Sequence, residues 1–244
     1  MRRFTLPPER VVEGRVTFDA DESRHLTRVL RLAPGDTVVA TDGAGRDYTV
    51  RLDSVGEAAS GTVLAVERGA PESPLAITLV QGIPKGDKME AIVRAATELG
   101  VARVRPALCE RTIVRLEPGR WRDRARRWQR VAREAAKQCG RAVIPEVEAP
   151  RPLAECLADG APADLGLCFW EGGGVPLHAA LAGVTVPRSA LLVVGPEGGL
   201  APAEVEAARA RGLTIASLGP RILRTETAGP AVVAILQSRF GDLR

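Results

Sequence analysis

The chain has 244 residues, of which 45% are hydrophobic and 26% charged, and its formal net charge is +4. This length suits one large domain or two small ones. No apolar run approaches the length of a membrane span, and the first residues lack the apolar core of a signal peptide. The four cysteines form no Cys-x-x-Cys pair, which argues against a zinc site and is typical of a reducing, cytoplasmic compartment. We expect all four to be small buried core residues, namely Cys109, Cys139, Cys156 and Cys168.

The positive charge is concentrated in the middle third of the chain. Residues 1–74 carry ten basic and twelve acidic side chains, and residues 146–244 carry eight and eleven. Residues 75–145 carry sixteen basic and seven acidic side chains, a net charge of +9. Such a local excess predicts a face that binds a polyanion such as RNA.

The first 70 residues alternate as a small β domain does, and the Gly- and Pro-containing stretch 69–74 predicts a linker after them. We therefore expect one domain over residues 1–70 and a second over residues 75–244. One helix is predicted within the first domain, with acidic residues in its first turn and Pro34-Gly35 after its end. The expected strands are 11–18, 37–41, 48–55 and 62–66, and the expected helix is 21–32.

From Leu75 onward, strand-like apolar runs alternate with helical patterns. This alternation predicts an α/β domain with a mostly parallel sheet. The expected strands are 76–80, 104–108, 164–169, 190–194 and 213–218, and the expected helices are 88–99, 118–139, one beginning near residue 202, and 231–236.

Two glycine-bearing runs follow two of these strands. Gly195-Pro196-Glu197-Gly198-Gly199 comes directly after strand 190–194, and Leu218-Gly219-Pro220-Arg221-Ile222-Leu223-Arg224-Thr225-Glu226-Thr227-Ala228 follows strand 213–218. Glycines let a ligand approach the backbone closely, and open α/β sheets bind ligands at the carboxyl ends of their strands. The alternative for the first run is a tight turn whose Glu197 favours the positive end of the next helix.

These two runs and three further blocks resemble the RsmE family, the ribosomal RNA uridine N3-methyltransferases of the SPOUT superfamily. The resemblance covers nearly the whole chain, with its blocks in the family's order. It implies a C-terminal SPOUT α/β domain threaded as a trefoil knot, although periodicity alone would not suggest a knot. It also implies a small N-terminal PUA-like or OB-like β-barrel domain that helps to hold RNA. The further blocks are Arg24 to Asp36, Lys85 to Glu90 with Glu98 to Val101, and Arg127-Trp128 with Glu134-Ala135-Ala136, Gln138 and Arg141.

The resemblance implies that the two glycine-bearing loops and a third loop after strand 164–169 hold S-adenosyl-L-methionine. No Gly-x-Gly-x-x-Gly follows an early strand, so the ordinary dinucleotide fingerprint is absent. Gly172-Gly173-Gly174 lacks that spacing and is expected to be a flexible link. The residues expected to bind the cofactor are Phe169, Trp170, Glu171, Gly195, Glu197, Gly198, Gly199, Leu218, Gly219, Ile222, Leu223 and Arg224.

Arg224 and Glu226 are the expected catalytic residues. Methylation of uracil N3 requires loss of the N3 proton, which a carboxylate can accept, while a guanidinium can stabilise negative charge spreading onto O2 and O4. Which of the two residues acts on the proton is left open. A purely structural alternative is a helix start with Thr225 or Thr227 as N-cap and Glu226 in the first turn.

An arginine-rich segment predicts contacts with RNA. Residues 120–133 contain seven arginines, and Trp121 and Trp128 lie seven apart, where one helical face can pack on the domain. The arginines on the opposite face can then contact phosphates, although a solvated basic helix is the alternative. His25 and His178 have no partner at ligand spacing, so no metal site is expected. The expected RNA-binding residues are Arg24, Arg28, Arg31, Arg122, Arg126, Arg130, Gln138 and Arg141.

The leading hypothesis is a cytoplasmic enzyme that transfers a methyl group from S-adenosylmethionine to N3 of a uridine. Its expected partners are 16S ribosomal RNA or the small ribosomal subunit and a second copy of the chain in a symmetric homodimer. One alternative is a SPOUT methyltransferase for another target such as tRNA ribose, against which the blocks in residues 20–36 and 85–141 argue. The other is a non-catalytic RNA-binding assembly factor, against which the intact loops argue.

Overall fold

The structure, a computed structural model, describes residues 3–244. They form two compact units. The first contains the chain up to Glu72 together with Arg133–Ile144, and the second contains Ser73–Ala132 and Pro145–Arg244. The sequence did not predict that residues 133–144 belong with the N-terminal unit. No helix among the described residues is both long enough and apolar enough to cross a membrane.

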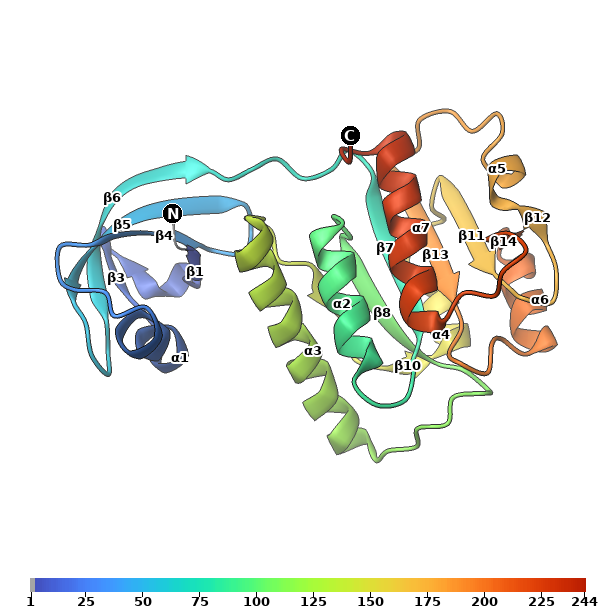
Figure 1. The fold of residues 1–244 in the computed structure, drawn as a ribbon, viewed down its shortest axis with the longest axis horizontal. Helices are drawn as coiled ribbons and strands as arrows, with labels where there is room; N and C mark the ends of the chain where they lie inside the picture. The colour runs from blue at the N-terminus through green and yellow to red at the C-terminus, as the bar shows by residue number, and fades with distance from the viewer. Residues whose placement is uncertain (1–2) are drawn as a thin grey trace. The chain divides into compact units, whose positions relative to one another are not determined.

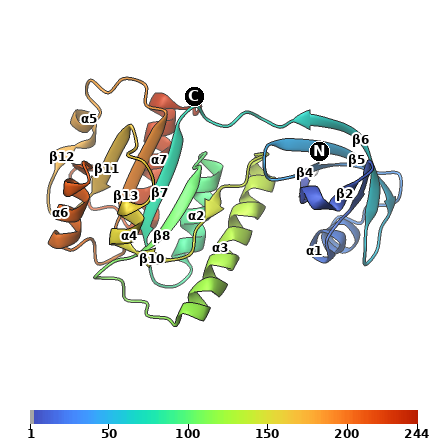
Figure 2. The ribbon, with the colours of Figure 1, turned by 180° about the vertical axis from the view of Figure 1, so that it is seen from behind.

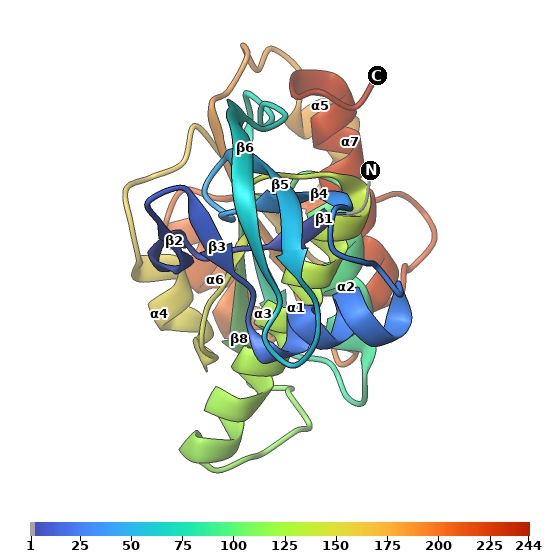
Figure 3. The same cartoon turned by 90° about the vertical axis from the view of Figure 1, so that its left-hand side faces the viewer.

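The N-terminal unit is built on a six-stranded sheet in the order β1-β4-β5-β6-β3-β2 (Figure 3). β1 runs parallel to β4, and the other neighbours are antiparallel. Inward-facing side chains such as Phe4, Leu6 and Val50 are fully buried and form its core. The elements are β1 (Arg3–Thr5), a 3-10 turn (Pro8–Arg10), β2 (Val11–Val12), β3 (Arg15–Thr17), α1 (Ala20–Arg24), a π-helical turn (His25–Val29), β4 (Thr37–Thr41), β5 (Arg46–Ser54) and β6 (Ser60–Arg68).

Two elements of this unit differ from the sequence prediction. The single strand expected over 11–18 is a hairpin, because Glu13 and Gly14 have φ values of 48° and 75° and form a two-residue turn. The helix expected over 21–32 is α-helical only to Arg24 and then widens into the π-helical turn. Arg31, with φ of 52°, has left the right-handed helical region altogether.

The second unit contains an eight-stranded sheet in which every pairing is parallel (Figure 1). Its order is β10-β8-β7-β13-β11-β14-β12, with β9 also paired to β8. The predicted α/β class with a parallel sheet is confirmed. The strands are β7 (Ala76–Gly82), β8 (Arg103–Leu108), β9 (Glu146–Val147), β10 (Arg151–Pro152), β11 (Leu165–Phe169), β12 (Val175–Pro176), β13 (Ser189–Val194) and β14 (Thr214–Ser217).

Helices cover both faces of this sheet. In Figure 1 α2 and α7 lie in front of it, and in Figure 2 α4 and α6 lie in front. Buried residues such as Val80, Cys168 and Val193 fill the layer between the sheet and α4 and α6. The helices are α2 (Lys88–Glu98), α3 (Pro118–Cys139, which continues into the first unit), α4 (Leu153–Ala158), α5 (Leu177–Ala180), α6 (Pro202–Ala210) and α7 (Thr225–Phe240).

Candidate active site

A cavity of about 740 Å³ lies at the carboxyl ends of β11, β13 and β14. Its wall is formed by residues 169–171, 173–174, 194–199, 216–226 and 228, together with Lys88. This volume lies in the range of small-molecule sites, and the position is the one at which open α/β sheets bind ligands.

Every residue that the sequence suggested for the cofactor lines this one cavity, as does Glu226. Neighbouring strand ends bring three separate loops together, because the strands run parallel and end at one edge of the sheet. The suggested residues are Phe169, Trp170, Glu171, Gly195, Glu197, Gly198, Gly199, Leu218, Gly219, Ile222, Leu223 and Arg224.

Lys88 links two acidic side chains of the cavity wall. Its Nζ lies 3.0 Å from Oε1 of Glu197 and 3.4 Å from Oε2 of Glu226. The hydrogen bond to Glu197 is the main reason why the pKa of Lys88 is raised. Burial disfavours the ionised form of Glu197, but hydrogen bonds from Lys88 and from backbone N–H groups outweigh burial and lower the pKa of Glu197.

The hydroxyl of Thr225 ties the first residue of α7 to the loop after β13. It donates a 2.7 Å hydrogen bond to the carbonyl oxygen of Gly195 and accepts one of 2.9 Å from Nε2 of Gln81. The N-cap of α7 is Arg224, which makes no side-chain cap bond, so the alternative with Thr225 or Thr227 as N-cap is wrong. Glu226 does lie in the first turn.

The glycines after β13 serve mainly to let protein backbone and side chains pack closely. A Cβ on Gly195 would lie 2.9 Å from the carbonyl carbon of Gly199, and one on Gly199 would overlap the carboxylate of Glu171. At Gly198 a Cβ would lie 3.1 Å from Cβ of Arg111, whose guanidinium donates to the Gly198 carbonyl oxygen at 3.0 Å. These contacts explain the glycines without invoking a ligand.

Gly219 is different. Its φ is +108°, and no atom lies within 4 Å of where its Cβ would be. The loop after β14 therefore leaves open space at this position, where a ligand can approach the backbone.

The sequence missed several residues of this site. Gly173 and Gly174 line the cavity with φ values of 140° and 128°, although the triple glycine was expected to be only a flexible link. A Cβ on Gly174 would lie 2.7 Å from the carbonyl oxygen of Ile215, so glycine lets the chain run against β14. Lys88 occurs in a block that resembles the family, but nothing in the sequence placed it beside residues 197 and 226.

On α3, the arginines expected to contact RNA are exposed. Arg122, Arg126 and Arg130 recur at every fourth position and so share one helical face, while Trp121 and Trp128 are buried, at 8% and 2% exposure. Arg126 is paired with Asp123. Among residues 3–244, no ion pair is found for Arg122 or Arg130.

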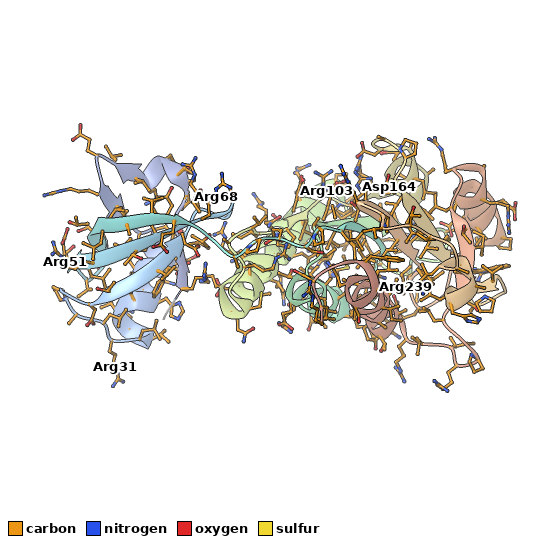
Figure 4. The ribbon with its side chains drawn as sticks, turned by 90° about the horizontal axis from the view of Figure 1, so that it is seen from above. Arg31, Arg51, Arg68, Arg103, Asp164 and Arg239 are labelled. Carbon is orange, nitrogen blue, oxygen red and sulfur yellow. The ribbon has the colours of Figure 1, made fainter. Side chains whose placement is uncertain are left out.

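The other suggested RNA-binding residues belong to the N-terminal unit. Arg24, Arg28 and Arg31 are exposed, and Figure 4 shows Arg31 projecting away from that unit. Gln138 is exposed as well, whereas Arg141 is paired with Glu72 and its side chain is 11% exposed.

Three of the four cysteines are buried, which disfavours their reactive thiolate form. Burial raises the pKa of Cys156 to about 11 and that of Cys168 to about 12, and raises that of Cys109 further. Cys139, the last residue of α3, is exposed, so the expectation of four buried cysteines is wrong for this residue. Within the part of the chain that the structure describes, no three His, Cys, Asp or Glu residues are grouped so as to hold a metal ion.

Comparison with known proteins assigns both parts of the chain. A model of the RNA methyltransferase domain matches residues 71–237, and one of the RNA methyltransferase PUA domain matches residues 18–58. A ribosomal RNA small subunit methyltransferase E from Synechocystis sp. is 36% identical over 95% of this chain and 76% of its own length. One from Bacillus subtilis is 32% identical over 93% and 92%.

Solved structures resemble the chain over its full length. A ribosomal RNA small subunit methyltransferase E from Neisseria gonorrhoeae, bound to S-adenosyl methionine, has a TM-score of 0.89, 34% identity and full coverage of both chains. A putative methyltransferase from Legionella pneumophila in complex with the same cofactor has a TM-score of 0.92, 30% identity and coverage of 100% and 99%. The chain therefore belongs to the RNA methyltransferase family, among the ribosomal RNA small subunit methyltransferase E proteins.

Proposed function

We propose that the protein methylates N3 of a uridine in 16S ribosomal RNA. The chain is an S-adenosylmethionine-dependent ribosomal RNA methyltransferase, as its family membership and its full-length similarity to cofactor-bound methyltransferases indicate. This assignment rests on the cavity at the ends of β11, β13 and β14. Arg224, Glu226 and every residue suggested for the cofactor line this same cavity. The choice of uridine N3 rests on the resemblance of the sequence blocks.

The residues of the cavity fit S-adenosylmethionine. Gly219 leaves open space beside the backbone, and Phe169 and Leu223 supply apolar surface at the wall. Glu171 supplies negative charge, which suits a ligand that carries a sulfonium and an ammonium group, whereas the charge of Glu197 is paired with Lys88. When bound, the cofactor supplies the methyl group on its sulfonium. The trefoil knot that the resemblance implies for these loops stays a prediction.

The chain's own residues would remove the proton and stabilise the charge. Glu226 accepts the N3 proton of the uracil at a carboxylate oxygen. Arg224 stabilises the negative charge that spreads onto O2 and O4 of the base as that proton leaves. Holding the base in place is the remaining contribution of the protein, because two reactants fixed in the right geometry react far faster than free ones.

RNA would be held by exposed arginines of both units. Arg122, Arg126 and Arg130 form a row on α3 in which Arg122 and Arg130 have no acidic partner among the described residues. A row of this kind can follow a phosphate backbone. In the N-terminal unit, the residues proposed to contact RNA are the exposed Arg24, Arg28, Arg31 and Gln138. Arg141, which is paired with Glu72 and 11% exposed, does not belong to this exposed set.

A symmetric homodimer in the cytoplasm is the proposed state of the enzyme. Apolar side chains exposed beside the cavity and on α7 support a partner surface, because Ile222 is 82% and Ile235 43% exposed. Sedimentation at micromolar concentration tests this proposal. A fully active monomer would refute the dimer.

The reaction is tested with purified protein, methyl-labelled S-adenosylmethionine and small ribosomal subunits from a strain that lacks the enzyme. Digestion of the RNA and mass spectrometry of its nucleosides should show 3-methyluridine at one position of 16S RNA, with naked 16S RNA and tRNA as parallel substrates. Label on tRNA ribose would favour the alternative RNA target. No label on any RNA, despite cofactor binding, would favour a non-catalytic assembly factor.

A further inference from the structure

Lys88, the first residue of α2, joins two carboxylates that belong to different segments of the cavity wall. Its Nζ lies 3.0 Å from Glu197, in the loop after β13, and 3.4 Å from Glu226, in the first turn of α7. The side chains of Lys88, Glu197 and Glu226 are 27%, 22% and 25% exposed. Charges with this exposure are screened less than fully exposed charges, so the pairing can help to orient both carboxylates.

The two carboxylates differ in how they are held. Glu197 also accepts hydrogen bonds from the backbone N–H of Lys85, at 3.2 and 3.3 Å. Oε2 of Glu226 is buried and accepts no hydrogen bond from the residues that the structure describes. Lys88 is the one cation paired with Glu226 in that part of the chain. The orientation of the Glu226 carboxylate therefore depends on Lys88.

The backbone beneath Glu226 is already fixed. Thr225, which is 6% exposed, holds the start of α7 through its bonds to Gly195 and Gln81. What remains free is the side chain of Glu226 itself. A glutamate has three rotatable bonds, and losing its charged partner would let the carboxylate leave the position from which it reaches the cavity.

We propose that Lys88 is a positioning residue for methyl transfer, which aims the Glu226 carboxylate at the uracil while Glu197 holds Lys88 in place. This inference rests on the proposed function. In the step concerned, the N3–H bond breaks and the proton goes to a carboxylate oxygen of Glu226. The electron pair left on N3 forms the bond to the methyl carbon, and the carbon–sulfur bond breaks with its pair retained by sulfur.

Replacing Lys88 tests the geometry of this arrangement. Lys88→Met should lower the single-turnover rate by about 10²-fold, the loss that a displacement of about 1 Å can cause. Affinities for S-adenosylmethionine and RNA should change little, so kcat falls without a matching rise in KM. Lys88→Arg should recover part of the rate because it keeps a cation at the site. Arg94→Met, which removes an exposed cation from the same helix, is the matched control and should keep the wild-type rate.

A double-mutant cycle separates positioning from general support of the fold. In Glu226→Gln the carboxylate is already gone, so adding Lys88→Met should cause no further loss of rate. Fully additive losses, or a Lys88→Met variant that loses only cofactor affinity, would overturn the proposal.

A titration of the Lys88 ammonium by NMR gives a readout that does not depend on activity. Its pKa is raised in the intact protein, and Glu197→Gln and Glu226→Gln should each lower it. If Glu226→Gln leaves that titration unchanged, Lys88 does not hold Glu226 and this proposal fails, even in an enzyme that methylates RNA. If both variants lower it but the wild-type protein transfers no methyl group to RNA, the ion pairs stand, and the proposed function and the positioning role fail together.

Discussion

The hydroxyl oxygen of Thr225 lies 2.7 Å from the carbonyl oxygen of Gly195, so that the start of α7 is bonded to the loop that ends β13. The same hydroxyl accepts a hydrogen bond from Gln81 at the end of β7. Thr225 and Gln81 are both buried. Three segments that lie far apart in the chain are therefore joined at one side-chain oxygen beside the cavity.

Replacing Thr225 with valine should weaken both the fold and cofactor binding. The variant removes the 2.7 Å hydrogen bond to the buried carbonyl oxygen of Gly195, which keeps only a 3.4 Å hydrogen bond from Nε2 of Gln81. Loss of one intramolecular hydrogen bond typically lowers the free energy of unfolding by about 0.5–1.5 kcal/mol. Urea denaturation and calorimetry with S-adenosylmethionine measure the two effects. Thr227→Val, at an exposed position of the same helix, should change neither. Unchanged cofactor affinity in Thr225→Val would restrict the role of this hydroxyl to the fold.

Glu226→Gln and Arg224→Ala should each lower the methyl-transfer rate by about 10²-fold or more, the usual scale for losing a proton acceptor or a charge stabiliser. Binding of RNA and cofactor should change much less, because both groups are proposed to act mainly in the transition state. Higher pH should partly rescue Glu226→Gln, since solvent can then take the N3 proton, and should rescue Arg224→Ala less. Single-turnover rates measured against pH report both effects. Glu206→Gln, at an exposed position of α6, is the control and should keep the wild-type rate. A wild-type rate in Glu226→Gln would leave the proton acceptor unidentified.

Replacing Arg122, Arg126 and Arg130 together with alanine should weaken RNA binding and reduce its dependence on salt. The logarithm of the affinity falls as the logarithm of the salt concentration rises, and each lost phosphate contact should make this slope less steep by about 0.7. Affinities measured by filter binding at four salt concentrations give this slope, and calorimetry should show unchanged cofactor affinity. Alanine at three exposed arginines elsewhere, Arg188, Arg209 and Arg211, is the control. Equal slopes in the triple variant and wild type would make the α3 arginines a solvated face.

Asp164 should make the stability of the second unit depend on pH. Its carboxylate accepts hydrogen bonds from the backbone N–H groups of Arg188 and Ser189, at 2.8 and 3.0 Å, which lower its pKa in the folded state (Figure 4 labels Asp164). The resulting stability is complete above the unfolded pKa of about 3.9 and is lost as the pH falls through the lowered folded value.

Asp164→Asn should therefore be less stable than wild type at pH 7. As the pH falls by about 2–3 units from pH 5, its free energy of unfolding should decrease less than that of the wild type. Urea denaturation across this range measures the difference. Asp242→Asn, at an exposed position near the end of the chain, should follow the wild-type curve. If the free energy of unfolding of Asp164→Asn changes with pH in parallel with that of the wild type, ionisation of Asp164 does not contribute to folding stability.

Local signals in the sequence predicted the elements that they determine. The bounds of α3 agree at both ends, and the two glycine-bearing loops lie at one cavity, because a loop that follows a parallel strand must emerge at the same sheet edge as its neighbours. The start of α7 was placed six residues late, since Gly229 and Pro230 disfavour a helix. At Gly229 a Cβ would lie 2.9 Å from Oε1 of Gln81, so a larger residue would require the buried Gln81 side chain to shift.

Tertiary contacts and one uncommon local backbone conformation decided the rest. Lys88 lies 109 residues before Glu197 along the chain, and no local pattern indicates that the two side chains meet. The hairpin turn at Glu13 depends on a positive φ that glutamate rarely adopts, so the sequence suggested an unbroken strand. Lys88, whose role depends on distant partners, thus escaped prediction, and so did the local turn at Glu13 and Gly14, because its backbone conformation is uncommon for glutamate.

The interleaved order of the large sheet also has a consequence for synthesis. β13 lies between β7 and β11, both of which precede it in the chain, and the cavity needs the loop after β14 and the first turn of α7. A growing chain can complete its N-terminal sheet early, but the wall of this cavity is complete only once the first turn of α7 has been synthesised. If this cavity holds the methyl donor, as proposed, an unfinished chain cannot transfer a methyl group, and activity requires synthesis of the start of the last long helix.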